Sequence, residues 1–159
     1  MEPEEREAMG NRRNKWIGRP AAAGLAAGVF LGALLYAAEK ATGLKVYTLL
    51  MNIDYVPVLK EYRFPAPVEF SFHLIVSVVL AVILFRIVLR FRWTGRRMAG
   101  WVTALNGIVG LGIWPVTALS ERTPALGDAA ALGVWLAAHL LYGGVLAWMF
   151  GRILRKEES

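Results

Sequence analysis

Four long apolar blocks dominate the order of residues along the chain, and charged or proline-containing connections separate them. The blocks cover about residues 20–38, 68–89, 98–119 and 129–151. Each is close to the ~20 residues that a helix needs to cross ~30 Å of hydrocarbon. Helices satisfy every backbone polar group within a span, and the blocks lack the alternating pattern of a membrane β-barrel. The pattern therefore predicts an all-α, polytopic membrane protein with a bundle of four transmembrane helices.

The composition agrees with this fold class. Of the 159 residues, 57% are hydrophobic and 19% are charged, whereas ordinary soluble domains have about 45–50% apolar and about 25% charged residues. A chain this short cannot bury so much apolar surface in one soluble core. The sequence contains no Cys, so disulfides and thiol chemistry are excluded.

The distribution of Lys and Arg predicts the orientation of the helices. Of the 18 basic residues, 13 lie in the leader of residues 1–19, near the connection between the second and third spans, or close to the tail of residues 152–159. Such an excess marks cytoplasmic segments, so both termini are expected in the cytoplasm. Topology thus accounts for the net charge of +6, and no nucleic-acid partner is expected. Arg92, Arg96 and Arg97 are candidates for holding anionic lipid headgroups.

The connection of residues 39–67 is the only long one. Val46 to Ile53 is apolar enough for a short helix or strand at the interface. Pro57, Pro65 and Pro67 prevent a continuous helix from this segment into the second span. We expect residues 39–67 to cap the outer face of the bundle.

Small residues recur at four-residue spacing in the first and last spans. They are Gly24, Gly28 and Gly32 in the first span, and Gly133 and Ala137 in the last. This spacing lets two helix backbones approach closely. One interpretation is packing inside a single bundle, and the other is a homo-oligomer through the first span. A face of that span left uncovered by the other helices would favour the oligomer.

Few polar side chains fall within the spans. Glu69 and His73 share one face of the second span, Asn106 lies in the third, and His139 lies near the middle of the fourth. Polar groups at such depths are costly and are candidates for function. In the structural interpretation, Glu69 is stabilised by a helix N-terminus and the histidines form hydrogen bonds between helices.

Two functional interpretations compete with the structural one. Glu69, His73 and His139 are candidates to line the pathway of a small oligomeric transporter or channel, with histidine as the titrating group. Alternatively, the two histidines are candidates for a haem- or quinone-binding redox protein. Their depths differ by roughly 6–8 Å, which is awkward for the two axial ligands of one iron.

Nothing in the sequence predicts a catalytic residue, a metal site or a cofactor. The chain has no G-x-S-x-G motif, and Glu69, His73 and His139 do not form a known zinc pattern. The glycines between Gly107 and Gly112 lie inside a span and indicate helix packing and not a phosphate-binding loop. The expected role is non-enzymatic: an accessory, structural or membrane-homeostasis component.

Three segments suggest a family. They are the first-span stretch GLAAGVFLG, the basic turn RFRWTGRR and the last-span stretch HLLYGGVLAWMFG. With these segments the chain resembles small bacterial four-span membrane proteins of the YqhR and YagU kind. The resemblance implies a multi-pass protein of the bacterial inner membrane, and it supplies no activity and no functional residue.

The absence of Cys makes single cysteines direct reporters of this topology. Leu126→Cys, in the connection between the third and fourth spans, is expected to react with a membrane-impermeant maleimide added outside intact cells. Thr94→Cys, in the basic turn, is the matched control and should react only after permeabilisation. Labelling of residue 126 from the cytoplasmic side would contradict the predicted orientation.

Overall fold

All the regular secondary structure in the described part of the chain is helical. The computed structural model describes residues 14–53 and 64–156, and these residues contain no strand. Four helices are long and apolar enough to cross a membrane: Trp16–Thr42, Ala66–Arg90, Gly95–Leu119 and Ala129–Arg155. The predicted all-α class with four membrane-length helices is therefore confirmed. Most of the predicted leader and the end of the tail lie outside the described residues.

The elements follow one another with short connections. In chain order they are η1 (Asn14–Gly18), α2 (Arg19–Thr42), α3 (Val46–Met51), α4 (Ala66–Arg90), α5 (Gly95–Ile113), η2 (Trp114–Leu119) and α6 (Ala129–Arg155). The four long helices extend beyond the predicted spans at one or both ends. The apolar part of the long connection forms the short helix α3, one of the two conformations expected for it.

The helix ends have local causes. α2 stops at Gly43, whose φ of 74° is the left-handed conformation that glycine adopts without strain. The Asp128 side chain accepts a hydrogen bond of 2.9 Å from the backbone N–H of Ala131 and so caps α6. Pro115 has no backbone N–H to donate to an α-helical hydrogen bond. The third span changes at this point from α-helix to the 3₁₀ helix η2.

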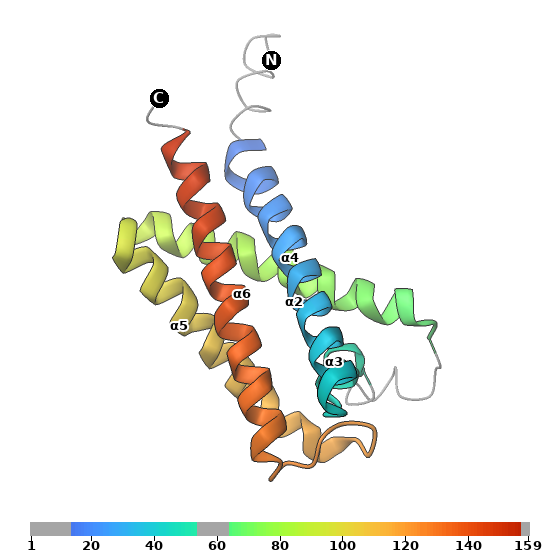
Figure 1. Cartoon of the computed structure of the whole chain (residues 1–159). Coiled ribbons are helices and arrows are strands. Elements are labelled where there is room, and N and C mark those ends of the chain that lie inside the picture. The colour runs from blue at the N-terminus through green and yellow to red at the C-terminus, as the bar shows by residue number, and fades with distance from the viewer. Residues whose placement is uncertain (1–13, 54–63, 157–159) are drawn as a thin grey trace.

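α2 and α6 form the centre of the bundle. α4 packs on α2, α5 packs on α6, and α2 packs on α6. α2 begins and α6 ends at the same end of the molecule, as Figure 1 shows. In the same view α4 runs obliquely across α2 and α6, and it diverges from α5 beyond the turn of residues 91–94 that joins them (Figure 1).

α2 and α4 approach each other closely at the glycines of α2. A Cβ atom placed on Gly24 would lie 2.6 Å from the Cβ of Ala81 and 2.8 Å from the backbone oxygen of Ser77. A Cβ on Gly28 would lie 2.8 Å from the Oγ of Ser77, and one on Gly32 would collide with the ring of Phe70. The predicted glycine stripe therefore packs inside the chain, as the first of the two interpretations requires.

Gly133 and Ala137 have a different environment from the one expected. Both are exposed, and a Cβ on Gly133 would meet open space. The inward face of α6 is set instead by large side chains, since Trp135, Tyr142 and Phe150 are buried. The small residues of the last span that contact a neighbour lie elsewhere: a Cβ on Gly143 would be 2.8 Å from the Cα of Thr103 on α5.

α3 covers one end of the bundle, and residues 54–63 of the predicted outer cap of residues 39–67 lie outside the described residues. It packs against α2, α4 and α6. The Glu39 carboxylate accepts hydrogen bonds of 2.8 Å from the backbone N–H and from the hydroxyl of Thr48, and so ties the first turn of α3 to the end of α2. Burial, together with the charges of Tyr36, Glu39 and Glu69, raises the pKa of Tyr47 on the same helix above its ordinary value.

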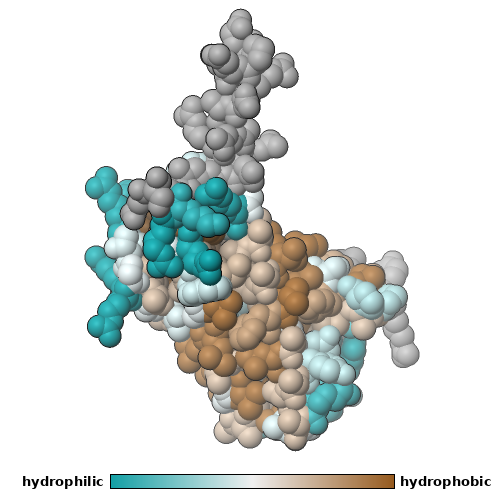
Figure 2. Space-filling model, turned by 45° about the horizontal axis from the view of Figure 1, so that its top comes forward, coloured by the Kyte–Doolittle hydropathy of each residue, from teal (hydrophilic) through white to brown (hydrophobic). Residues whose placement is uncertain are grey.

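The face of the bundle in Figure 2 is mostly apolar at its centre, and hydrophilic residues gather at its upper left and lower right. Many large hydrophobic side chains are exposed on the long helices, among them Leu25, Val29, Ile75, Val76, Val79, Ile83, Ile108, Leu111 and Leu141. Soluble monomers rarely expose a contiguous apolar patch of more than a few hundred Å². The surface therefore suits a multi-pass membrane protein.

The α2–α4 contact leads to a stability prediction. Gly24→Ala is expected to lower the free energy of unfolding by about 1–3 kcal/mol, because the new methyl group would press on backbone atoms of α4 that cannot move aside. Gly133→Ala is the matched control and should have little effect, since that position is open. Reversible denaturation in mixed micelles measures both, and equal losses would contradict the packing described.

Candidate functional site

A cavity of about 460 Å³ lies between α4, α5 and α6, with α3 at one end. This volume falls within the range of small-molecule sites, about 300–1,000 Å³. The lining is mostly apolar, and the structure brings all four predicted polar residues to it: Glu69, His73, Asn106 and His139. It adds Ser77, Trp135 and Tyr142, which the sequence did not single out.

The cavity has a mouth on the flank of the bundle. Ile75 and Val76 line it on α4, and their side chains are 57% and 59% exposed. α4 and α5 diverge on this side (Figure 1). On the α3 side, Leu49, Leu50 and Ile53 line the cavity. An apolar molecule can therefore reach the cavity from the side of the bundle.

The opposite end of the cavity is closed by packed side chains. Two helical turns beyond Ser77 and Tyr142, the rings of Phe85 and Phe150 meet edge to face at 5.0 Å between centroids. Both rings are fully buried, and so is Val102, one turn from Asn106 on α5. Within the described residues, the cavity thus ends near the middle of the bundle.

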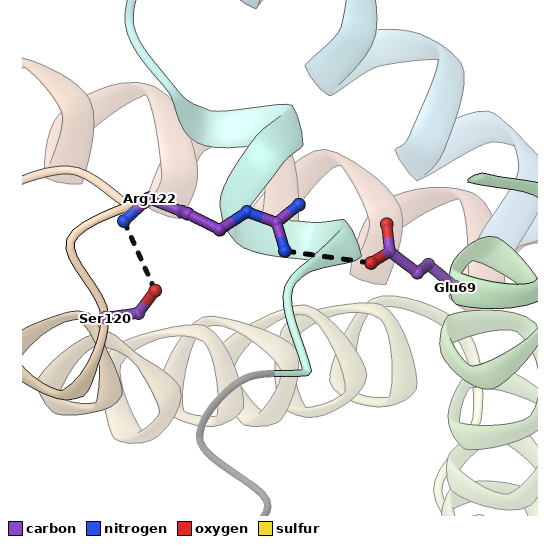
Figure 3. Close-up of polar contacts among 3 residues, drawn as sticks. All are labelled: Glu69, Ser120 and Arg122. Carbon is purple, nitrogen blue, oxygen red and sulfur yellow. Dashed lines mark hydrogen bonds and ion pairs between the residues drawn. The ribbon is translucent and has the colours of Figure 1, made fainter. Parts of the chain in front are cut away.

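Glu69 lies at the α3 end of the cavity, in the first turn of α4. Its Oε1 is 3.9 Å from Nη1 of Arg122, which reaches over from the connection between η2 and α6, as Figure 3 shows. The backbone N–H of Arg122 donates to the hydroxyl of Ser120 at 3.3 Å. Glu69 is thus a rim residue at a helix start, as the structural interpretation expected. Sequence reasoning missed its partner, although Arg122 is the one basic residue in that connection.

His73 joins α4 to α2. Its Nε2 lies 3.2 Å from the backbone oxygen of Gly28. A carbonyl oxygen can only accept, so Nε2 carries the proton and Nδ1 of the neutral ring is an acceptor. This interhelical hydrogen bond matches the structural interpretation of His73.

His139 does not form the interhelical hydrogen bond that the structural interpretation expected. Its Nδ1 donates to the backbone oxygen of Trp135 on its own helix at 2.9 Å. The ring packs against Gly110 of α5, where a Cβ would be 2.8 Å from the imidazole Cγ. Trp135 makes the bond between helices instead, because its Nε1 donates to the Gly110 oxygen at 2.9 Å.

Ser77 and Tyr142 form a buried link across three helices. The Ser77 hydroxyl donates to the backbone oxygen of Gly24 at 2.7 Å, and its oxygen is 2.9 Å from the hydroxyl of Tyr142. The Ser77 hydroxyl has one proton, which it donates to the Gly24 oxygen, so Tyr142 is the donor of the second bond. The available signal was that both residues are isolated polar positions within apolar runs.

Asn106 is almost fully buried, with 1% of its surface exposed. Its Nδ2 donates to the backbone oxygen of Val102 at 2.8 Å. Its Oδ1 has no hydrogen-bond partner. An unpaired buried oxygen costs about 1–3 kcal/mol, which makes this atom a candidate for contact with a bound molecule.

A metal centre finds no support in the geometry. In residues 14–53 and 64–156, no three His, Asp or Glu side chains are grouped closely enough to hold an ion. The two histidines line one cavity, but one ring nitrogen of each forms a hydrogen bond with a backbone carbonyl oxygen.

The basic end of the molecule has two grooves beside α6. One, of about 630 Å³, is lined by Arg96 and Arg155, and the other, of about 380 Å³, by Arg19, Arg152 and Lys156. Trp148 lines both grooves. The other two predicted headgroup ligands, Arg92 and Arg97, are exposed near the turn between α4 and α5.

No protein-family model, curated protein or solved structure matches this chain. The resemblance to YqhR and YagU proteins stays a prediction, and the function has to be argued from the cavity and its chemistry.

The link between Ser77 and Tyr142 can be measured by a double-mutant cycle. Ser77→Ala, Tyr142→Phe and the double variant are expected to give a coupling free energy of about 0.6 to 1.7 kcal/mol, the range for hydrogen bonds between membrane helices. Tyr36→Phe, at an exposed tyrosine of α2, should show no coupling with Ser77→Ala. A coupling of zero between Ser77 and Tyr142 would contradict the hydrogen bond.

Proposed function

We propose that the chain is a non-enzymatic integral membrane protein that binds a small lipid-soluble molecule in the cavity between α4, α5 and α6, as an accessory or membrane-homeostasis component. One observation carries the proposal: a cavity of about 460 Å³, mostly apolar, gathers the few polar side chains of the spans from three different helices. Binding sites for small molecules combine such a lining with a few polar groups that fix orientation.

The closed end of the cavity favours binding over a continuous pore. A channel needs a polar pathway through the bundle, whereas Phe85, Phe150 and Val102 fill the core beyond Asn106. The transporter alternative keeps one supporting observation, because Glu69, His73 and His139 all line the cavity. It requires a second conformation in which the packed end opens.

The proposal includes the predicted setting in a bacterial inner membrane with both termini in the cytoplasm. It is supported by the common end of the molecule at which α2 begins and α6 ends, together with the charge excess of the leader, the basic turn and the tail. Anionic headgroups are proposed partners there, and the groove between Arg96 and Arg155 supports this.

Self-association through the first span stays a prediction. Gly24, Gly28 and Gly32 already contact α4, so a second copy would have to use another face of α2. Leu25 and Val29 are exposed on that helix.

Occupancy of the cavity can be tested by blocking its mouth. The protein is reconstituted in lipid nanodiscs with either 4-octylphenol or 4-octylanisole, and bound probe is counted by native mass spectrometry. Val76→Trp is expected to reduce binding to background, because Val76 lines the mouth. Val79→Trp is the matched control, since Val79 is similarly exposed on α4 at 52% but does not line the cavity.

Two results would contradict the proposed function. One is that neither probe binds the wild-type protein above the level seen with Val76→Trp. The other is that Val76→Trp and Val79→Trp lower the binding of both probes equally.

A further inference from the structure

The donors that line the cavity are already used inside the protein, apart from the second N–H of Asn106 Nδ2. Trp135 Nε1 donates to the Gly110 oxygen, and the Ser77 hydroxyl donates to the Gly24 oxygen. The Tyr142 hydroxyl must therefore donate to Ser77, whose proton is spent. Each of these hydrogen bonds joins two helices, so a ligand could recruit one of these donors only by breaking a contact of the bundle.

Apart from this N–H, the polar atoms left over on the cavity-lining side chains are acceptors. Asn106 Oδ1 has no hydrogen-bond partner, and only 1% of the surface of this residue is exposed. His139 donates through Nδ1 to Trp135, which leaves Nε2 of the neutral ring as an acceptor. His73 donates through Nε2 to Gly28, which leaves Nδ1. Three helices, α4, α5 and α6, thus contribute one free acceptor each.

The charges around the cavity favour a neutral ligand. Neither His73 nor His139 has a carboxylate at ion-pair distance among the described side chains, so an imidazolium there would be uncompensated. Glu69, at the outer rim, has the guanidinium of Arg122 beside it. The cavity therefore offers no unbalanced anion to hold a cationic head group.

We propose that the cavity selects a neutral lipid-soluble molecule whose head group donates hydrogen bonds, namely an alcohol or a phenol. This inference rests on the proposed function and specifies its ligand class. A hydroxyl group would supply the partner that Asn106 Oδ1 lacks, with His139 and His73 as further acceptors. Ethers, esters and ketones of the same size present only acceptors and would leave these atoms unpaired.

A preference for hydrogen-bond donors would also distinguish the two redox states of a quinone, the ligand of the redox alternative. A benzoquinone carries two carbonyl acceptors, whereas the corresponding hydroquinone carries two O–H donors. Of this pair, the cavity would hold the hydroquinone more tightly, because only the reduced form can donate to Asn106 and the histidines.

The test compares two probes that differ in one O–H group. In nanodiscs with equal mole fractions of probe, 4-octylphenol is expected to bind about tenfold more tightly than 4-octylanisole, the effect of about one neutral hydrogen bond in a buried site. 4-Octylbenzylamine provides a cationic donor and is expected to bind more weakly than the phenol. Native mass spectrometry gives the bound fraction in each case.

Two variants locate the preference. Asn106→Leu replaces the unpaired oxygen by an apolar group of similar size and should bring the affinity for the phenol close to the affinity for the anisole. His139→Leu should reduce the preference in part. Anisole binding also reports whether each variant keeps a folded cavity; where it is lost, Asn106→Asp, which retains an oxygen acceptor, is compared instead and should keep the preference for the phenol.

The outcomes separate this inference from the proposed function. Equal binding of phenol and anisole, both blocked by Val76→Trp, would overturn the donor selectivity and leave the binding cavity intact. Tighter binding of the amine than of the phenol would overturn the choice of a neutral ligand. Failure of all three probes to bind would overturn the proposed function itself.

Discussion

The close contact between α2 and α4 determines most of the architecture. Apolar helices gain little hydrophobic free energy from meeting one another in a bilayer, so backbone proximity and interhelical hydrogen bonds have to hold them together. Gly24 and Gly28 allow Ser77 to reach the α2 backbone. The resulting course of α4 takes it across the bundle and away from α5 (Figure 1). Because α4 lines the cavity together with α5 and α6, its contact with α2 also determines which of its residues face the cavity.

Glycine has a second role at these contacts. Three glycine carbonyl oxygens accept hydrogen bonds from side chains of a neighbouring helix: Gly24 from Ser77, Gly28 from His73, and Gly110 from Trp135. A missing side chain exposes the backbone oxygen as well as the Cα, so close packing and polar bonding occur at the same residues. These bonds also use most of the donors of the cavity lining, so the polar atoms that remain free there are mainly acceptors.

Much of the fold could be predicted from the sequence, because long apolar runs have one economical structure in a membrane. Which helices pack against each other could not be predicted in this way. The stripe of Gly24, Gly28 and Gly32 indicated a close contact but not its partner, and Gly133 and Ala137 have the same spacing yet are exposed. The face of α6 that packs inside the bundle is the one that carries Trp135, Tyr142 and Phe150. Large side chains fill a core, whereas small ones only permit two helices to approach.

The candidate site shows the same limit. Residue type and depth were enough to single out Glu69, His73, Asn106 and His139. That they line one cavity depends on the course of α4 relative to α5, which is a property of tertiary packing. Periodicity likewise gave no indication that His139 bonds its own helix while Trp135 bonds the next one.

The position of the mouth determines which ligand concentration would govern binding, the one in the membrane or the one in water. Ile75 and Val76 open the cavity toward the apolar flank of the bundle and not toward either hydrophilic end. A molecule that enters there arrives by two-dimensional diffusion among lipid chains. Its occupancy would follow its number per lipid molecule, so a compound almost insoluble in water could still saturate the protein, and dilution of the cells in buffer would not release it.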